Sequence, residues 1–374
     1  MLEYVTAGES HGSGLIAVVS GMPAGLEIDR KFLDALLARR QGGYGRSVRQ
    51  KIENDRADFL SGVRRGVTTG NPITLRVKNK ARTLSRLPPV TRPRPGHADL
   101  AGLLKFGHDA DARDVLERSS ARETAVRTAV GGLGALLLRE FGIAVFGHVA
   151  RLGPVRFKAG VSDAAVRDAS PFYSFDPPGD KKARRAVDEA AKAGDTLGGI
   201  VEVVATGVPP GLGSNVQASQ RLDGRLASAL MAIPAMKGVE FGIGFDAAKK
   251  RGSQVHDRIR ARKGGGLTRP TNRAGGLEGG MSNGQPIVVR VAMKPLSTLK
   301  KSLESVDLKT GKRKDAHFER SDVTAVPAAS VIAEAVVAFV LAQAFREKFG
   351  GDSMKEVRRN VAGYYDQIAE YWRP

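Results

Sequence analysis

Two stretches of the chain, 66–77 and 280–291, follow one pattern. Each reads Gly, three residues, Gly, Asn or Gln, Pro-Ile, two residues, then Arg-Val. Glycine and proline at these positions indicate a turn, and the β-branched residues that follow favour a strand. The chain must therefore build the same turn and strand twice, which constrains its fold more than any other feature of the sequence.

Two further pairs of segments extend the repeat in the same order. An amphipathic helix expected at 29–40 has a counterpart expected near 222–233. Apolar helices then end in similar sequences, Arg-Glu-Phe-Gly at 139–142 and Arg-Glu-Lys-Phe-Gly at 346–350. Because the pairs keep their order, we infer an internal duplication.

The duplication predicts how the chain is organised. We expect one domain over 1–374, with halves at about 1–150 and 190–350 joined by a basic connection at 151–189. The period is too long for a solenoid, which repeats every ~20–50 residues. Strands follow one another through turns as often as through helices. The expected fold class is therefore α+β, with mostly antiparallel sheets and helices against them.

One imidazole breaks the symmetry of the repeat. The segment 8–12, Gly-Glu-Ser-His-Gly, aligns with 194–198, Gly-Asp-Thr-Leu-Gly. Both keep the glycines, an acid and a hydroxyl, as expected for a loop that enters a strand. His11 has no counterpart, and an imidazole can give or take a proton near neutral pH. His11 is therefore a candidate catalytic residue.

The composition indicates the cellular compartment in which the protein is expected. The sequence contains no cysteine, so it has no disulfides or thiolate metal ligands, and a reducing compartment such as the cytoplasm fits it. The apolar run at 15–19 is too short for a signal peptide. A longer apolar run at 328–345 includes Glu334, so we expect a buried helix there rather than a membrane span.

A formal net charge of +20 has two interpretations. The first is a nucleic-acid-binding protein. However, aromatic residues make up only 6% of the chain, and the basic residues are spread over many loops rather than forming one tail. The second is an electropositive cleft that captures small polyanions such as phosphates and carboxylates.

His97 is a second candidate for proton transfer. The prolines between 82 and 97 disfavour a helix, so we expect His97 to be a loop histidine with Arg94 and Asp99 beside it. Taken alone, this loop favours a surface or structural histidine. The remaining histidines are His108, His148, His256 and His317. They lie outside such groups and lack the spacing of metal ligands, so we expect no metal site.

The segment 118–125, Arg-Ser-Ser-Ala-Arg-Glu-Thr-Ala, combines a helix start with two arginines. Ser120 and Glu123 fit a capping box at the start of a helix that runs to Phe141. Free N–H groups at a helix N-terminus bind anions, so we expect a phosphate site there. A purely structural cap would not need the adjacent arginines.

Three segments of the second half complete the set. The glycine-rich stretch 272–280 suits close contact with a flat ligand, although a turn also explains its glycines. Lys-Pro-Leu-Ser-Thr at 294–298 offers a cation and two hydroxyls for a phosphate. Arg-Ser-Asp at 320–322 precedes the last long apolar helix, where Ser321 or Asp322 would also serve as an N-cap.

Together these motifs strongly resemble those of chorismate synthase. The family's order is kept by the segment 8–12, by Arg-Pro-Gly-His-Ala-Asp at 94–99, by 118–125, and by Gly-Gly-Met-Ser-Asn-Gly at 279–284. The resemblance extends from about residue 4 to about residue 350. Motifs of this length in this order are highly specific.

The resemblance implies a reaction and its partners. Chorismate synthases convert 5-enolpyruvylshikimate 3-phosphate to chorismate and phosphate by an anti-1,4-elimination, the last step of the shikimate pathway. The reaction needs reduced FMN although it involves no net redox change, and NADPH is one candidate reductant. The family fold is a β-α-β sandwich with helices between the sheets, and the usual assembly is a homotetramer. We expect a small-molecule substrate, and neither nucleic acid nor a membrane, as partner.

By resemblance, three residues match catalytic positions. His11 matches an acid near the leaving phosphate, and His97 matches an acid that keeps reduced flavin protonated. Which histidine has which role stays open. Asp322 matches the family's aspartate, which sits by the flavin and assists removal of the hydrogen at carbon 6.

The resemblance also implies binding residues. Positions that match the flavin site are Arg118, Ser119, Ser120, Pro234, Ala235, Gly279, Lys294, Pro295, Leu296, Ser297, Thr298 and Arg320. Positions that match NADP or substrate contacts are Arg40 and Arg46. The rest of the expected substrate site is Ser10, Arg49, Arg94 and Arg122.

The chain departs from the family's pattern at two places. Val115, Leu116 and Glu117 stand where some relatives have glycines, so the resemblance does not extend to a flexible loop there. Pro234 stands where many relatives have a polar residue, so no side-chain contact is carried over. A flavin-dependent relative that acts on another phosphorylated acid is a further alternative.

Overall fold

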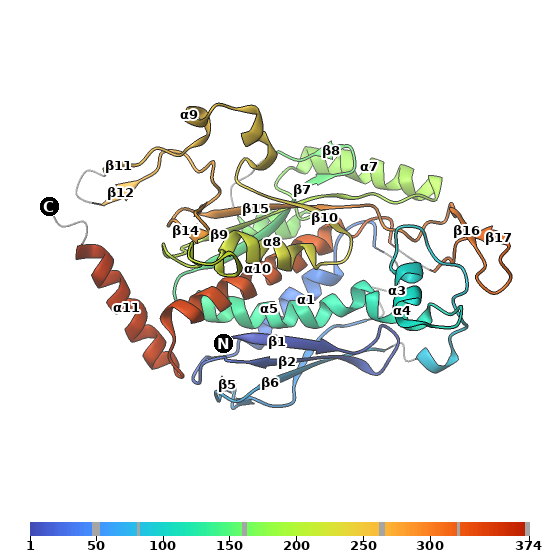
Figure 1. The fold of residues 1–374 in the computed structure, drawn as a ribbon, viewed down its shortest axis with the longest axis horizontal. Coiled ribbons are helices and arrows are strands. Elements are labelled where there is room, and N and C mark those ends of the chain that lie inside the picture. Colours follow the sequence, from blue (N-terminus) through green and yellow to red (C-terminus); the bar gives the residue numbers. More distant parts are fainter. Residues whose placement is uncertain (47–52, 81–82, 159–162, 262–265, 320–321, 371–374) are drawn as a thin grey trace.

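The computed structural model describes residues 1–46, 53–80, 83–158, 163–261, 266–319 and 322–370. Two antiparallel sheets lie on opposite sides of a layer of helices (Figure 1). The predicted fold class, α+β with mostly antiparallel sheets and helices packed between them, is confirmed.

The first sheet has the strand order β1-β2-β6-β3. Its strands are β1 (Glu3–Ala7), β2 (Gly14–Ser20), β6 (Ile73–Lys78) and β3 (Ala57–Phe59). Along β2, Leu15, Ala17 and Val19 are buried, whereas Ile16 and Val18 are exposed. Because successive side chains of a strand point to opposite faces, one face of this sheet covers the helices and the other faces outward.

The second sheet has the order β10-β15-β9-β7-β8. Its strands are β10 (Met236–Phe241), β15 (Ile287–Met293), β9 (Gly199–Thr206), β7 (Ala144–Leu152) and β8 (Val155–Arg156). Val201, Val203 and Ala205 of β9 are buried, and Val203 lies opposite the buried Val289 of β15. The β-branched inner face therefore packs on the helix layer.

The helix layer consists of α1 (Arg30–Gln41), α5 (Thr124–Arg139), α8 (Leu222–Met231) and α10 (Val326–Phe349). Helix α10 is apolar on nearly all sides and forms the centre of the core. It is long and apolar enough to cross a membrane, but 94% of its apolar window is buried inside the protein. A Cβ at Gly131 of α5 would lie 2.2 Å from the carbonyl oxygen of Ala335, so this glycine lets α5 approach α10 closely.

The two sheets have the same internal order. The chain passes through β1, β2, α1, β3, β6 and α5 in the first half, and through β7, β9, α8, β10, β15 and α10 in the second. Strand β2 lies between β1 and β6, and β9 lies between β7 and β15. We infer that these are two copies of one unit, which is the duplication that the sequence predicts.

The boundary between the halves differs from the predicted one at residue 150. Strand β7 begins at Ala144 and pairs with β9, so the first half ends before β7. The expected connection, 151–189, contains β8, α6 (Ala164–Ala169) and most of α7 (Pro177–Ala193). It therefore lies within the second half, between its first two strands.

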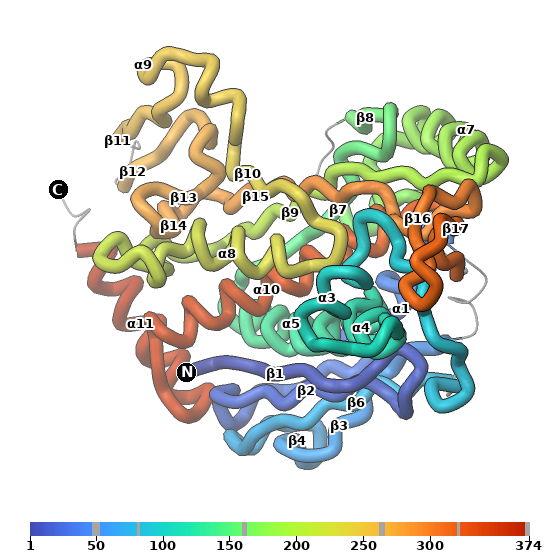
Figure 2. Tube along the Cα trace, turned by 45° about the vertical axis from the view of Figure 1, so that its right-hand side comes forward, coloured from blue at the N-terminus to red at the C-terminus, as the bar shows by residue number. Residues whose placement is uncertain are grey.

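Shorter elements extend from these two units. They are β4 (Val63–Arg64), β5 (Val67–Thr68), η1 (Leu84–Arg86), α3 (Asp99–Phe106), α4 (Arg113–Ser119), η2 (Ala121–Glu123), η3 (Ala218–Gln220), η4 (Gly244–Lys249), α9 (Gly252–Val255), β11 (Arg260–Ala261), β12 (Leu267–Thr268), β13 (Leu277–Glu278), β14 (Met281–Ser282), β16 (Glu304–Val306), β17 (Arg313–Asp315) and α11 (Met354–Glu370). Figure 2 shows α3 and α4 beside β16 and β17 at one end of the molecule. There the N–H of Leu308 donates to the carbonyl of Thr91 at 2.9 Å, so loops of both halves meet.

Candidate active site

A cavity of about 640 Å³ is lined by residues of both halves. Its size suits a small-molecule ligand. The three catalytic candidates, His11, His97 and Asp322, all line it. The other predicted residues that line it are Ser10, Arg40, Arg46, Arg94, Arg118, Ser119, Ser120, Arg122, Pro234, Ala235, Lys294, Leu296, Ser297 and Thr298.

Four predicted residues are not brought to this cavity. Arg49 and Arg320 lie outside the described residues. Pro295 is not among the residues that line the cavity. Gly279 lies in the turn between β13 and β14, away from the lining. This turn packs on the start of α8, where the N–H of Leu222 donates to the carbonyl of Gly280 at 2.8 Å.

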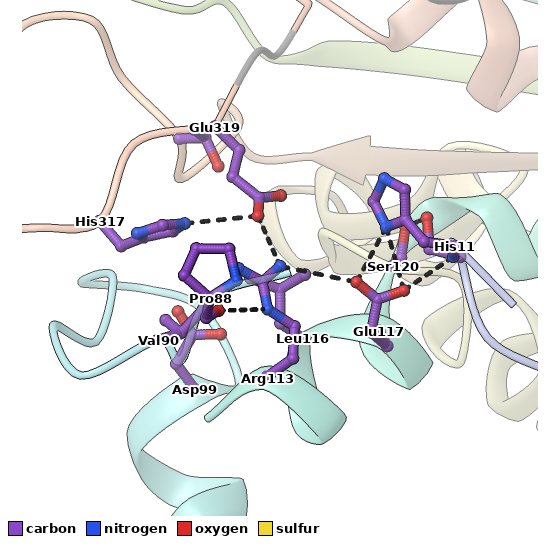
Figure 3. Close-up of polar contacts among 12 residues, drawn as sticks. His11, Pro88, Val90, Asp99, Arg113, Leu116, Glu117, Ser120, His317 and Glu319 are labelled. Atoms are coloured by element: carbon purple, nitrogen blue, oxygen red, sulfur yellow. Dashed lines mark hydrogen bonds and ion pairs between the residues drawn. The ribbon is translucent and has the colours of Figure 1, made fainter. Parts of the chain in front are cut away.

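His11 is held by the carboxylate of Glu117, which comes from α4 (Figure 3). The backbone N–H of His11 donates to Glu117 Oε2 at 2.8 Å, and its ring Nδ1 lies 2.9 Å from Oε1. The Glu117 side chain is fully buried. Burial raises the pKa of this carboxyl, but hydrogen bonds from the ring and backbone of His11 outweigh burial and lower it. Glu117 is therefore an anion that accepts from Nδ1, which leaves Nε2 for the cavity.

Arg113 extends this contact into a network of charges (Figure 3). Its NH1 lies 3.6 Å from Glu117 Oε1 and 2.8 Å from Glu319 Oε1. His317 Nε2 lies 3.3 Å from the same oxygen of Glu319. The hydrogen bond from His317, with help from Arg113 and against the effect of burial, lowers the pKa of Glu319 to about 2. The prediction that His317 lies outside the charged groups of the site is wrong. The segment that includes β16 and β17, between β15 and α10, brings His317 to Glu319 and Arg113.

His97 has a different partner, the buried carboxylate of Asp99. Its Nδ1 lies 2.6 Å from Asp99 Oδ1. Arg94 donates to the same carboxylate from its backbone N–H, Nε and NH2, and its NH1 donates to Thr298 Oγ1 at 3.0 Å. Burial raises the pKa of Asp99, but the bonds from His97 and Arg94 hold it well below its usual range. The expected neighbours of His97 are confirmed, and Arg94 links them to the segment 294–298.

Two predicted arginines share one buried aspartate. Arg122 NH1 donates to Asp55 Oδ1 at 2.6 Å, and Arg40 NH1 donates to Asp55 Oδ2 at 3.1 Å. The Nε of Arg122 donates to Asn79, and the Nε of Arg40 donates to Thr124. Burial lowers the pKa of Arg40 to about 10, so its guanidinium stays positive at neutral pH. Both arginines give much of their donor capacity to internal acceptors, and they shape the cavity wall as well as its charge.

Asp322 lies beside Arg46 in the cavity wall. Arg46 NH1 is 2.9 Å from Asp322 Oδ2. Arg46 follows a glycine turn in which Gly43 and Gly45 have φ of 96° and 87°, values that favour glycine. The N–H of Val323 donates to the carbonyl of Gly45 at 2.9 Å. The turn therefore places Arg46 against the segment that precedes α10.

The segment 118–125 departs from the predicted capping box. Helix α4 ends one residue before Ser120, and Ser120 caps the short η2 turn by accepting from the N–H of Arg122 at 3.3 Å. The Glu123 carboxylate accepts instead from Thr6 Oγ1 at 2.9 Å. The reciprocal half of the box is replaced because β1 places a hydroxyl within reach of Glu123. Ser120 is therefore a cap, but of η2 rather than of the long helix α5, and the predicted capping box is absent.

Glu117 and Asp55 are site residues that the sequence did not single out. Glu117 lies four residues after Arg113, a spacing that suits a pair on one helix face and was a usable local signal. The sequence shows the departure from glycine at this position but gives no sign of the contact with His11. Asp55 gave no local signal, because tertiary structure brings Arg40 and Arg122 to it.

Comparison with known proteins identifies the family. The family described as chorismate synthase matches residues 2–345. The chorismate synthases of Trichlorobacter lovleyi and Moorella thermoacetica are 53% and 52% identical to this chain, and each match covers 99% of this chain and 100% of the relative. A crystal structure of a chorismate synthase matches with a TM-score of 0.80 at 40% identity and covers 98% of both chains. The family predicted from the motifs is confirmed, together with its class of enzyme, a lyase. The chain belongs to the chorismate synthase family.

Proposed function

We propose that this cavity performs the anti-1,4-elimination of phosphate from 5-enolpyruvylshikimate 3-phosphate, which gives chorismate. The observation that carries the proposal is a pair of histidines in one cavity, each bonded through Nδ1 to a buried carboxylate. A phosphate leaves poorly from apolar surroundings, so its departure needs cations and an acid beside it. The imidazoles and the arginines of the lining supply both.

Reduced FMN is the proposed cofactor, and the lining fits it. One part of the wall is small and apolar, which suits a flat ring: Ala325, Ala328, Ala329 and Ile332. Another part carries cations and hydroxyls suited to a phosphate: Arg118, Lys294, Ser297 and Thr298. A bound reduced flavin would supply an electron-rich ring beside the breaking carbon–oxygen bond.

The contacts of each histidine support separate roles. His11, with Nε2 free of Glu117, is assigned to the leaving phosphate as the acid. His97 is assigned to the flavin, because its partner Arg94 reaches Thr298 in the proposed flavin segment. Asp322 is assigned to removal of the hydrogen at carbon 6, since its carboxylate lines the cavity.

The substrate's negative groups are assigned to the arginines. Arg46 is the first of these, because a substrate carboxylate or phosphate in the cavity would compete with Asp322 for it. Arg40, Arg94 and Arg122 contribute positive charge from more tightly held positions. Arg40 and Arg46 are also the proposed NADP contacts.

Three finer properties are proposed from the family resemblance: reduction of FMN by NADPH or by a separate reductase, a homotetramer, and a cytoplasmic location. Anaerobic NADPH oxidation in the presence of FMN tests the first. Light scattering on the purified protein tests the second. Fractionation of source cells tests the third.

Flavin binding tests the proposal as a whole. We expect the affinity for FMN to rise when 5-enolpyruvylshikimate 3-phosphate is present, because both ligands share one cavity. Salt-sensitive binding to arbitrary duplex DNA without flavin binding would support the nucleic-acid alternative, which family membership does not favour. A relative with another phosphorylated substrate would bind flavin without this enhancement.

A further inference from the structure

The Glu117 carboxylate contacts one residue, His11, at both its backbone and its ring. Oε2 accepts the backbone N–H of His11 at 2.8 Å, and Oε1 lies 2.9 Å from the ring Nδ1. The second contact selects one tautomer, because an ionised carboxylate only accepts and Nδ1 must then carry the proton. Figure 3 shows the other ring nitrogen of His11 on the side away from Glu117. Glu117 itself does not line the cavity, so it reaches the substrate only through His11.

The charge of Glu117 is only partly balanced by Arg113. The carboxylate is fully buried, and removing it from water costs several kcal/mol unless a cation compensates. Arg113 lies 3.6 Å from Glu117 but 2.8 Å from Glu319, so two carboxylates share one guanidinium. The ring of His11 is the other group in direct contact with this charge, through Nδ1 at 2.9 Å.

We propose that Glu117 is the positioning residue for His11 in the elimination, a role that rests on the proposed function of the cavity. It keeps the proton on Nδ1, directs Nε2 into the cavity and stabilises the positive ring beside the departing phosphate. When the carbon–oxygen bond breaks, its electron pair leaves with the phosphate. The electron pair of the carbon 6–hydrogen bond becomes part of the new double bonds of the ring, and that proton passes to Asp322, the group assigned to it above. The Nε2 proton passes to a phosphate oxygen, and a neutral ring with its proton on Nδ1 remains. An acid that orients an imidazole in this way is known from hydrolytic triads.

The loop around His11 has supports other than Glu117. Asn79 Nδ2 donates to the carbonyls of Glu9 and Gly12, at 3.0 Å each. Arg118 NH1 donates to the carbonyl of Gly8 at 3.1 Å. Removing the charge of Glu117 should therefore leave the loop backbone in place. An effect on the His11 ring can then be separated from a loss of fold.

The substitution Glu117→Gln tests the proposal, because the amide keeps the size and one acceptor but loses the charge. We expect kcat to fall about 10- to 100-fold, less than for loss of the imidazole itself, and KM to change less than about 3-fold. FMN affinity should be unchanged. In ¹⁵N spectra, the share of His11 rings with the proton on Nδ1 should fall. Glu117→Asp, which keeps the charge, should recover part of the rate.

The matched control is Glu347→Gln, the same exchange in a solvent-accessible ion pair with Arg225. It should leave the rate, FMN affinity and the His11 signals as in the wild type. The proposal is overturned if Glu117→Gln keeps the full rate. It is also overturned if the rate, FMN affinity and melting temperature fall together while the Nδ1 signal is kept, because that pattern is purely structural.

If Glu117→Gln does not fold, the role of Glu117 can still be tested with another variant. Glu117→Asp then serves alone: a partial rate with the Nδ1 signal kept supports the proposal, and a full rate with that signal lost overturns it. The proposed function fails separately, if the wild type forms no chorismate. In that case a change of the His11 tautomer in Glu117→Gln would still show that Glu117 keeps the proton on Nδ1 of His11.

Discussion

The two histidine–carboxylate pairs of the cavity share one contact but differ in the charge around it. Asp99 accepts three hydrogen bonds from Arg94 besides its contact with His97. Glu117 takes its hydrogen bonds from His11, and Arg113 lies 3.6 Å away. The charge of Asp99 is therefore largely offset by Arg94, whereas most of the charge of Glu117 acts on His11.

This difference separates the tasks of the two imidazoles. The charge of Glu117 is directed at the ring of His11, and a leaving phosphate needs a proton donor whose position is fixed in this way. His97 belongs to a more neutral and more tightly bonded group, which also contacts Thr298 through Arg94. That arrangement suits an imidazole that keeps its place beside a cofactor.

The largest expected effect is that of His11→Ala. We expect kcat to fall by about 10²–10⁴-fold, the usual range for a lost general acid, while the protein stays folded. Steady-state kinetics under anaerobic conditions and circular dichroism check both parts. His256→Ala, the same exchange at an exposed position, should keep the wild-type rate. A fully active His11→Ala would remove His11 from the reaction.

Asp99→Asn should lower the free energy of unfolding more than Glu117→Gln does, which would distinguish the two histidine–carboxylate pairs. It leaves the buried guanidinium of Arg94 without its ionic partner, so we expect a loss of about 3 kcal/mol in the free energy of unfolding. Glu117→Gln should lose less, because Arg113 keeps Glu319. Urea denaturation of the two variants checks this order. Equal losses of stability in the two variants would mean that arginines balance the charges of the two carboxylates to the same extent.

The decrease in the free energy of unfolding at low pH should depend partly on Glu319. Its pKa is lowered to about 2 in the folded protein, so it contributes stability that is present above about pH 4.5 and is lost as the pH falls through about 2. Because Glu319 is partly exposed, we expect about 1–2 kcal/mol from it. The difference between wild type and Glu319→Gln in the free energy of unfolding should shrink by this amount on acidification. A difference that does not vary with pH would exclude the contacts with His317 and Arg113 as the cause of the lowered pKa.

The smallest expected effect is that of Thr298→Val. This exchange keeps the shape of the side chain but removes the acceptor for Arg94 NH1. We expect a cost of about 1 kcal/mol and a weakening of FMN binding by about 5-fold. Fluorescence titration with FMN measures it. Unchanged FMN binding would argue against placing the His97 group beside the flavin.

Local patterns predicted the features that lie within one segment. The repeated turn and strand predicted two related α+β units, and two sheets of matching order are present. His11 stood out because its counterpart in the repeat is a leucine. His97 stood out because Arg94 and Asp99 are close to it in sequence, and these three residues are hydrogen-bonded.

Contacts between distant segments could not be predicted in this way. Glu117 and His11 are 106 residues apart, and their contact depends on how α4 packs against a loop of the first sheet. Asp55 likewise joins Arg40 to Arg122 only in the folded chain. The place of strand β7 depends on its pairing with β9 rather than on a motif.

The central claim is that this cavity eliminates phosphate from 5-enolpyruvylshikimate 3-phosphate with reduced FMN. The most direct measurement mixes the protein, reduced FMN and this substrate under anaerobic conditions and follows chorismate, phosphate and flavin absorbance together. We predict one phosphate released for each chorismate formed, with the flavin still reduced at the end. The absence of chorismate, with the substrate recovered intact, would contradict the claim.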